Sequence, residues 1–219
     1  MTTDKPCKLL VLLSGSGSNL QAFIDQCQSG ELPARICAVI SNRPGAPGLE
    51  RARLANIDTR VIDHTLFNSR ESFDQGLMEC IDNYAPDLLI LAGFMRILTP
   101  AFVNHYEGRL LNIHPSLLPK YPGLNTHQRA IDAGDTEAGA TVHFVTEELD
   151  GGPAAIQAAL NIQAGDDAAS LARRILALEH QIYPLAARWF AEGRLRLEHQ
   201  RAVLDGEILP AGGYLYRAK

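Results

Sequence analysis

Two polar side chains near the middle of the chain have types and spacing suited to acid–base chemistry. Asn112 and His114 lie two residues apart at the end of an apolar run, so in a strand their side chains point to the same side. Pro115 stops such a strand and holds the histidine at the edge of a sheet. A carboxamide beside an imidazole can stabilise an oxyanion and move a proton near neutral pH. The alternative for His114 is a hydrogen-bonded structural histidine.

A third candidate is Asp150, in the glycine-containing turn 147–153. A carboxylate there could approach His114, favour its charged form and orient a water molecule. Alone, an aspartate beside glycines in a hairpin turn has a structural explanation, so its role depends on partnership with His114. The other histidines show no metal-ligand spacing. We therefore expect no metal, and we interpret these histidines as surface or packing residues: His64, His105, His127, His143 and His199.

The segment Ser14–Asn19 (SGSGSN) is a glycine-rich loop between an apolar run and a helical pattern. Glycines let the backbone approach an anion, and a helix N-terminus offers unpaired N–H groups. Leu20 stands where a dinucleotide site would have a third glycine, and no acidic residue follows the second expected strand. The loop therefore predicts a monophosphate site, with a serine-capped structural turn as the alternative.

These residues must be positioned by an alternation of short apolar segments and helical segments. Strands are expected at 8–13, 36–40, 59–62, 88–91, 110–113, 140–145 and 154–161. Helices are expected from Ser18 or Asn19 to Gly30, at 49–55, at 69–83 with Asn68 and Glu71 as a capping box, after Thr99, before Gly134, and from Asp166 or Asp167 to about 192. Such alternation predicts an α/β fold with a doubly wound, mostly parallel sheet.

The last two expected strands are joined by too short a link for a helical crossover. The C-terminal portion of the sheet should therefore be antiparallel. We find no repeat and no linker long enough to divide the chain. The prediction is one domain over residues 1–219, with a phosphate-binding part at about 1–100 and a catalytic part at about 85–190.

Composition narrows the classes of partner and compartment. The 219 residues are 46% hydrophobic and carry a formal net charge of −5, which disfavours a surface that neutralises nucleic-acid phosphates. No apolar run approaches the ~20 residues of a membrane span, and Leu9–Leu13 is too short for a signal-peptide core. Four scattered cysteines suggest buried thiols in a reducing compartment. We expect a cytoplasmic protein without nucleic-acid or membrane partners.

Together these motifs resemble the phosphoribosylglycinamide formyltransferases, the small folate-dependent enzymes of purine synthesis. The resemblance covers nearly the whole chain. The stretches that carry it are 14–19, APDLLILAGFMRIL at 85–98, LLNIHPSLLPKYPG at 110–123, VHFVTEELDGGP at 142–153 and Glu179-His180 before Tyr183-Pro184. It implies a formyltransferase-like fold in which the catalytic part at about 85–190 also binds folate. It further implies transfer of formyl from 10-formyltetrahydrofolate, the co-substrate, to the amine of glycinamide ribonucleotide.

The resemblance also implies roles for individual residues. Asn112, His114 and Asp150 would form the catalytic set, while the substrate would be held by Gly17, Ser18, Asn19 and Glu179. Folate would be bound by residues that include apolar pocket walls: Arg70, Met95, Arg96, Ile97, Leu98, Leu91, Phe94, Leu110, Val145 and Asn112. The apolar members have ordinary core packing as their alternative.

Two positions depart from the family pattern. Asn125 stands where a histidine is frequent, and Leu176 where a polar residue often assists the phosphate. Rival functions are a formyl-folate hydrolase, a formyltransferase acting on transfer RNA, and a non-catalytic nucleotide sensor. The first two are expected to carry an extra N- or C-terminal domain, for which this chain is too short. We expect a monomer or a homodimer.

Overall fold

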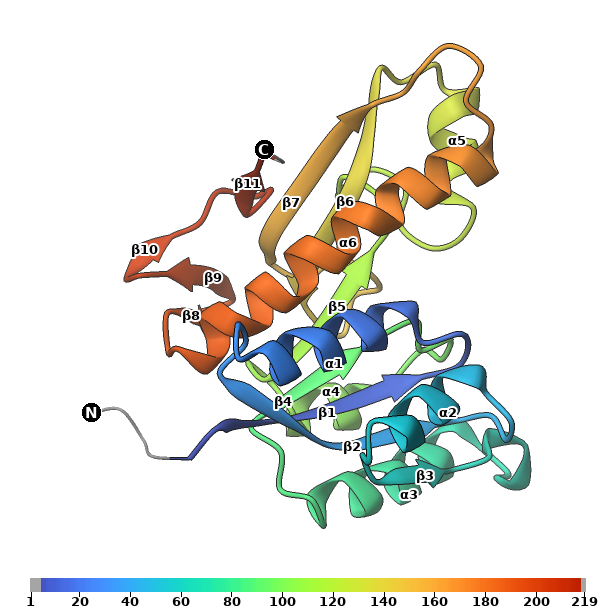
Figure 1. Cartoon of the computed structure of the whole chain (residues 1–219), viewed down its shortest axis with the longest axis vertical. Coiled ribbons are helices and arrows are strands. Elements are labelled where there is room, and N and C mark those ends of the chain that lie inside the picture. Colours follow the sequence, from blue (N-terminus) through green and yellow to red (C-terminus); the bar gives the residue numbers. More distant parts are fainter. Residues whose placement is uncertain (1–4, 218–219) are drawn as a thin grey trace. The chain divides into compact units, whose positions relative to one another are not determined.

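The computed structural model describes residues 5–217, which form two compact units that divide between Leu111 and Asn112. Strands and helices alternate along the first unit, and a mostly parallel sheet with an antiparallel part confirms the predicted fold class. Figure 1 shows the elements. Strand β5 (Leu110–His114) carries the division, so its last three residues begin the second unit.

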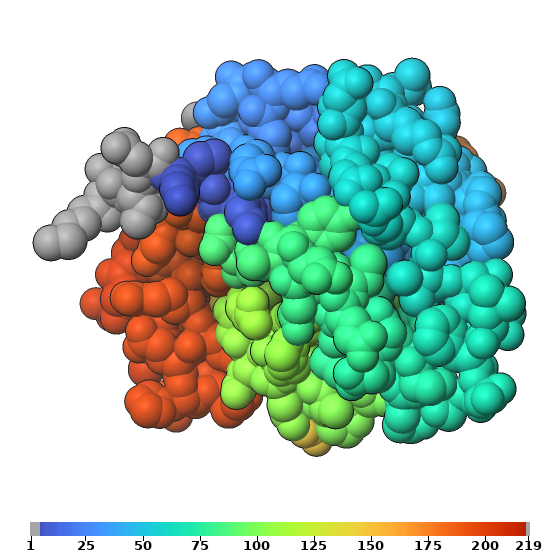
Figure 2. Space-filling model, turned by 90° about the horizontal axis from the view of Figure 1, so that it is seen from below, coloured from blue at the N-terminus to red at the C-terminus, as the bar shows by residue number. Residues whose placement is uncertain are grey.

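The first unit is built on four parallel strands in the order β4-β1-β2-β3. Its elements are β1 (Cys7–Leu13), α1 (Ser18–Ser29), β2 (Ala34–Ser41), α2 (Pro47–Leu54), β3 (Thr59–Val61), the 3-10 helix η1 (His64–Leu66), α3 (Arg70–Asp82), β4 (Leu88–Leu91) and α4 (Pro100–His105). The segment from α2 to α3, cyan to teal, forms a continuous part of this unit's surface in Figure 2.

Burial on both faces explains why the sequence of β1 is an unbroken apolar run. Leu9–Leu13 are fully buried, as a central parallel strand requires. Helix α1 contributes Leu20, Phe23 and Ile24 from one apolar stripe, all of them buried. The carboxyl end of β1 is thereby fixed by core packing, and the glycine-rich loop begins there.

The second unit has a sheet in the order β11-β7-β6-β5 and a small antiparallel sheet in the order β10-β9-β8. Its elements after β5 are α5 (Thr126–Asp132), β6 (Glu137–Phe144), β7 (Ala154–Asn161), α6 (Ala168–Ala191), β8 (Leu195–Glu198), β9 (Arg201–Leu204), β10 (Glu207–Ile208) and β11 (Tyr214–Tyr216). Strands β6 and β7 pair antiparallel, as their short link predicted. Helix α6 packs against both of these strands.

Two helix starts differ from the sequence prediction. Helix α1 follows Gly17 in a left-handed conformation and has no side-chain cap, so neither Ser18 nor Asn19 serves as one. The box at the start of α3 joins Ser69 to Ser72 rather than Asn68 to Glu71. A serine one residue later offers the same reciprocal bonds, which moves the helix start without changing its existence.

Strands β8 to β11 were not predicted at all. Each is two to four residues long, too short for a clear alternation of polar and apolar positions. The turns between them place His199, Gln200, Asp205 and Gly206 at positive φ. Such pairs of left-handed residues make two-residue hairpin turns, and Asp-Gly is a favoured sequence for them.

Candidate active site

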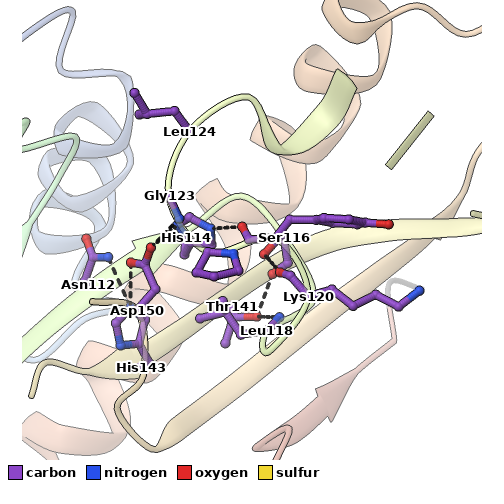
Figure 3. Close-up of polar contacts among 12 residues, drawn as sticks. Asn112, His114, Ser116, Leu118, Lys120, Gly123, Leu124, Thr141, His143 and Asp150 are labelled. Carbon is purple, nitrogen blue, oxygen red and sulfur yellow. Dashed lines mark hydrogen bonds and ion pairs between the residues drawn. The ribbon is translucent and has the colours of Figure 1, made fainter. Parts of the chain in front are cut away.

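The two strand-end residues Asn112 and His114 lie on the same side of β5, as alternation predicted, and Figure 3 shows them close to Asp150. The His114 side chain is 6% exposed, while Asn112 is half-buried. His114 Nδ1 is 3.4 Å from Asp150 Oδ2. The structure therefore brings the imidazole and the distant carboxylate together.

Backbone geometry in the turn after β6 explains how Asp150 reaches that position. Asp150 has a φ of 52°, a left-handed conformation that aspartate tolerates better than most residues. A Cβ on the following Gly152 would lie 1.9 Å from the Phe144 carbonyl oxygen, so only glycine fits there. The Gly123 N–H then donates to Asp150 Oδ2 at 2.9 Å. The tight turn and this bond together aim the carboxylate at His114.

Both ring nitrogens of His114 face hydrogen-bond acceptors. Nε2 lies 2.8 Å from the Tyr121 carbonyl oxygen, and Nδ1 faces the Asp150 carboxylate. Neither partner can donate a hydrogen, so the doubly protonated ring is the form that satisfies both. The arrangement suits a charged imidazolium beside a carboxylate.

His143 also belongs to this cluster, although sequence reasoning treated it as a surface or packing residue. Its Nε2 is 3.1 Å from Asn112 Nδ2 and 3.8 Å from Asp150 Oδ1. The residue is 2% exposed, and burial lowers the pKa of its imidazole. A histidine in an otherwise apolar strand directly before the Asp150 turn was the signal that could have found it.

The loop that leaves β5 is held by a buried hydroxyl on β6. Thr141 Oγ1 donates to the Ser116 carbonyl at 2.7 Å and accepts from the Leu118 N–H at 3.1 Å. The Ser116 hydroxyl donates to the Lys120 carbonyl at 2.6 Å. These bonds, drawn in Figure 3, fix the chain between His114 and the residues that contact it.

The glycine-rich loop of the first unit borders a hollow of about 300 Å³. Gly17 has a φ of 70°, and a Cβ there would lie 2.7 Å from the Gly48 Cα, so this position requires glycine. Ser14 Oγ donates to Asn42 Oδ1 at 2.5 Å and accepts from the Met95 N–H at 2.8 Å. The hollow is lined by Ser14 to Asn19, Arg43, Ala92, Gly93 and Met95. Its size and exposed N–H groups suit a phosphate.

Comparison with known proteins identifies the chain. The family model described as formyl transferase matches residues 7–187. The phosphoribosylglycinamide formyltransferase of Escherichia coli strain K12 is 55% identical over 206 residues, which are 94% of this chain and 97% of that protein. The chain belongs to the phosphoribosylglycinamide formyltransferase family. The relative of that name from Haemophilus influenzae is 51% identical over 94% of this chain and 98% of its own length.

A solved structure of a phosphoribosylglycinamide formyltransferase from Coxiella burnetii has the same fold. It superposes with a TM-score of 0.94 at 52% identity, covering 97% of this chain and 100% of that chain. Family membership confirms the predicted class, a one-carbon transferase of purine biosynthesis with 10-formyltetrahydrofolate as co-substrate. It therefore also favours catalysis over a non-catalytic sensor.

The remaining predicted site residues lie in varied surroundings. Leu91, Leu110 and Phe94 are buried, as either pocket walls or core would be. Met95 and Ile97 are 56% and 58% exposed, which is unusual for apolar side chains in a core and suits a ligand surface. The others are Arg70, exposed at the start of α3; Glu179, buried on α6; and Arg96, Leu98 and Val145, which are half-buried.

Arg96 places a positive charge beside an aromatic ring. The Arg96 guanidinium lies 5.7 Å from the centre of the Phe73 ring, within cation–π range. Within residues 5–217 no group of histidine, cysteine and acidic side chains could hold a metal ion. In the same residues no helix is long and apolar enough to cross a bilayer.

Proposed function

We propose that this chain transfers the formyl group of 10-formyltetrahydrofolate to the amine of glycinamide ribonucleotide, using Asn112, His114 and Asp150. The observation that carries the proposal is the convergence of those three side chains from two distant segments of the second unit. The relatives' names specify phosphoribosylglycinamide as the substrate of those proteins, and this supports the same acceptor here.

The reaction begins with attack of the neutral substrate amine on the formyl carbon, without a covalent enzyme intermediate. The carbonyl oxygen becomes an oxyanion, which accepts hydrogen bonds from the Asn112 amide and from protonated His114. Asp150 stabilises the imidazolium across the 3.4 Å contact. His114 Nε2 exchanges the Tyr121 carbonyl for the oxyanion when substrates bind.

Collapse of the tetrahedral adduct completes the transfer. The bond between the formyl carbon and the folate N10 breaks, and the electron pair of that bond stays on N10. The attacking nitrogen loses one proton, and N10 gains one, relayed through a water molecule held by Asp150. The products are formylglycinamide ribonucleotide and tetrahydrofolate.

The first unit contributes the proposed phosphate site. Gly17, Ser18 and Asn19 present backbone N–H groups at the start of α1, and the left-handed Gly17 lets an anion approach the backbone closely. Glu179 is proposed to bind the amino end of the substrate. Arg70, Arg96 and the exposed apolar residues of 95–98 are proposed for folate.

Net charge and cysteine chemistry support proposals about partners and location. We propose no nucleic-acid partner, because the chain carries a net charge of −5, and either a monomer or a homodimer. The four cysteines are half-buried rather than buried as expected, and all are free of disulfides, which supports a cytoplasmic location. Partial burial raises the pKa of the Cys7 thiol to about 12. Such thiols are protonated and inert in a reducing compartment.

One assay tests the proposed reaction against hydrolysis. Purified protein is incubated with 10-formyltetrahydrofolate, with and without glycinamide ribonucleotide, while tetrahydrofolate and formate are measured. The proposal expects tetrahydrofolate to form only when the amine is present, without free formate. Formate released in the absence of the amine would instead establish a hydrolase.

A further inference from the structure

The two ring nitrogens of His143 have partners of opposite kinds. Nδ1 is 2.9 Å from the Phe144 carbonyl oxygen, and Nε2 is 3.1 Å from Asn112 Nδ2. A carbonyl oxygen only accepts, so Nδ1 carries the hydrogen of a neutral ring. Nε2 then has a free lone pair and accepts a hydrogen bond from the Asn112 amide. The tautomer of His143 thereby determines which end of that amide faces the ring.

The surroundings of His143 favour this neutral form. The side chain is 2% exposed, and burial, the largest influence, lowers the pKa of the ring. Two charged groups of the site face it from neighbouring segments: the Asp150 carboxylate, 3.8 Å from Nε2, and the His114 ring. The carboxylate favours the charged form and His114 opposes it. At 3.8 Å the carboxylate is also too far for a hydrogen bond.

The Phe144 carbonyl is available because the β6–β7 pairing is irregular at this point. The register shifts between Val142 and His143, and a shift of this kind re-aims side chains at the end of a strand. A Cβ on Gly152 would collide with the Phe144 oxygen at 1.9 Å. The bulge and Gly152 together leave this oxygen within reach of His143 Nδ1.

We propose that His143 is a positioning residue that holds the Asn112 amide with its nitrogen toward the ring. One Nδ2 hydrogen binds His143, and the second remains for the oxyanion that forms on the formyl group. Without His143 the amide can rotate by half a turn and present its oxygen to the oxyanion, which repels it. The inference rests on the proposed function, in which Asn112 is an oxyanion donor.

A double-mutant cycle on kcat tests this coupling. His143→Leu removes the acceptor, and we expect kcat to fall roughly 10- to 100-fold, because misorienting a donor costs somewhat less than deleting one. KM for both substrates should stay within about twofold, since the change affects stabilisation of the transition state. In an Asn112→Ala background, the same substitution should change kcat by less than about twofold. Non-additivity of this kind reports that the two residues act as a unit.

Conservative replacement separates positioning from a packing role. His143→Gln can place an amide oxygen near the former Nε2 position, and we expect it to restore most of the kcat lost in His143→Leu. Thermal unfolding of all variants shows whether each is folded. If His143→Leu does not fold, His143→Ala, which also lacks the acceptor, is measured with and without Asn112→Ala to complete the cycle.

Two outcomes would overturn the inference while leaving the reaction intact. An equal loss of kcat from His143→Leu in both Asn112 backgrounds would show that His143 does not act through Asn112. A loss that disappears only in an Asp150→Asn background would place its action on the carboxylate instead. Failure of the proposed function is seen separately, because Asn112→Ala alone would then keep full kcat.

Discussion

Residue types at strand ends made the proposed catalytic cluster predictable. Asn112 and His114 share a strand, so alternation alone placed them on one side. Asp150 was predicted only through its suitability as a partner, and its 3.4 Å contact with His114 bears out that geometry. The role of His143 was not predicted: its place in the strand before the Asp150 turn was the one local signal, and its contact with Asn112 arises from a register shift and a pairing between strands.

Asn112→Ala tests the oxyanion role directly. Loss of one such donor costs about 10²- to 10³-fold in turnover, so we expect kcat to fall by that factor while substrate binding persists. Steady-state kinetics with both substrates measure the two effects. Asn161→Ala serves as a matched control, because Asn161 is exposed at the end of β7. Unchanged turnover in Asn112→Ala would remove Asn112 from the mechanism.

Arg43 allows a second test of a single residue, this time at the proposed phosphate site. It is an exposed arginine in the wall of the hollow beside the glycine-rich loop. We expect Arg43→Ala to raise KM for glycinamide ribonucleotide about 5- to 20-fold, since a charge-assisted hydrogen bond contributes roughly 1–2 kcal/mol. Arg53→Ala, on the exposed surface of α2 and outside the set lining the hollow, is the matched control. Equal KM values in both variants would exclude Arg43 from phosphate binding.

Elements were predicted well where core packing sets them and less well at their ends. Strand β4 and the Thr99-capped α4 match their expected positions, because an apolar run and a Thr-Pro pair are strong local signals. The cap of α3 shifted by one residue because Ser69 and Ser72 supply equivalent bonds, whereas α1 follows the left-handed Gly17 and has no side-chain cap. The missing side-chain cap leaves the glycine-rich loop before α1 in place, because the close approach of Gly17 to Gly48 fixes that loop.

Helix α5 carries a histidine that makes stability depend on pH. His127 Nε2 is buried without a hydrogen-bond partner, and burial, then the nearby His114, lowers the pKa of His127. The folded state therefore disfavours protonation that the unfolded chain accepts near pH 6.5. Stability from this group is complete above about pH 6.5 and is lost as the pH falls through the lower folded pKa.

Denaturant titrations between pH 5 and 8, a window of about 1.5 units on either side of the reference value, measure this effect. We expect His127→Gln to reduce the decline of the unfolding free energy toward acid. His199→Asn, at an exposed turn, should leave that slope unchanged. A decline as steep in His127→Gln as in the unaltered protein would contradict the assignment.

At the scale of the whole molecule, the least predictable part is the C-terminal region. The family model ends at residue 187, yet β11 pairs with β7 in the sheet of the second unit. The Trp189 and Tyr214 rings meet edge to face with centroids 5.3 Å apart, and the Tyr216 hydroxyl donates to Gln181 at 2.9 Å. This return of the chain is a tertiary contact, which sequence periodicity does not report. The structure divides into two compact units, and the single domain over residues 1–219 stays a prediction.

Deleting residues 213–219 tests how far this strand stabilises the second unit. The aromatic pair contributes about 0.5–1.5 kcal/mol and the hydrogen bond about 1 kcal/mol, so we expect Tm to fall by roughly 4–10 °C. Tyr216→Phe removes the hydroxyl bond alone and should account for about half of that fall. Because β11 lies on the far side of β7 from the strands that carry His143 and Asn112, kcat of the folded deletion variant should stay within about twofold. A loss of kcat without a loss of Tm would show that the strand supports the active site rather than the sheet.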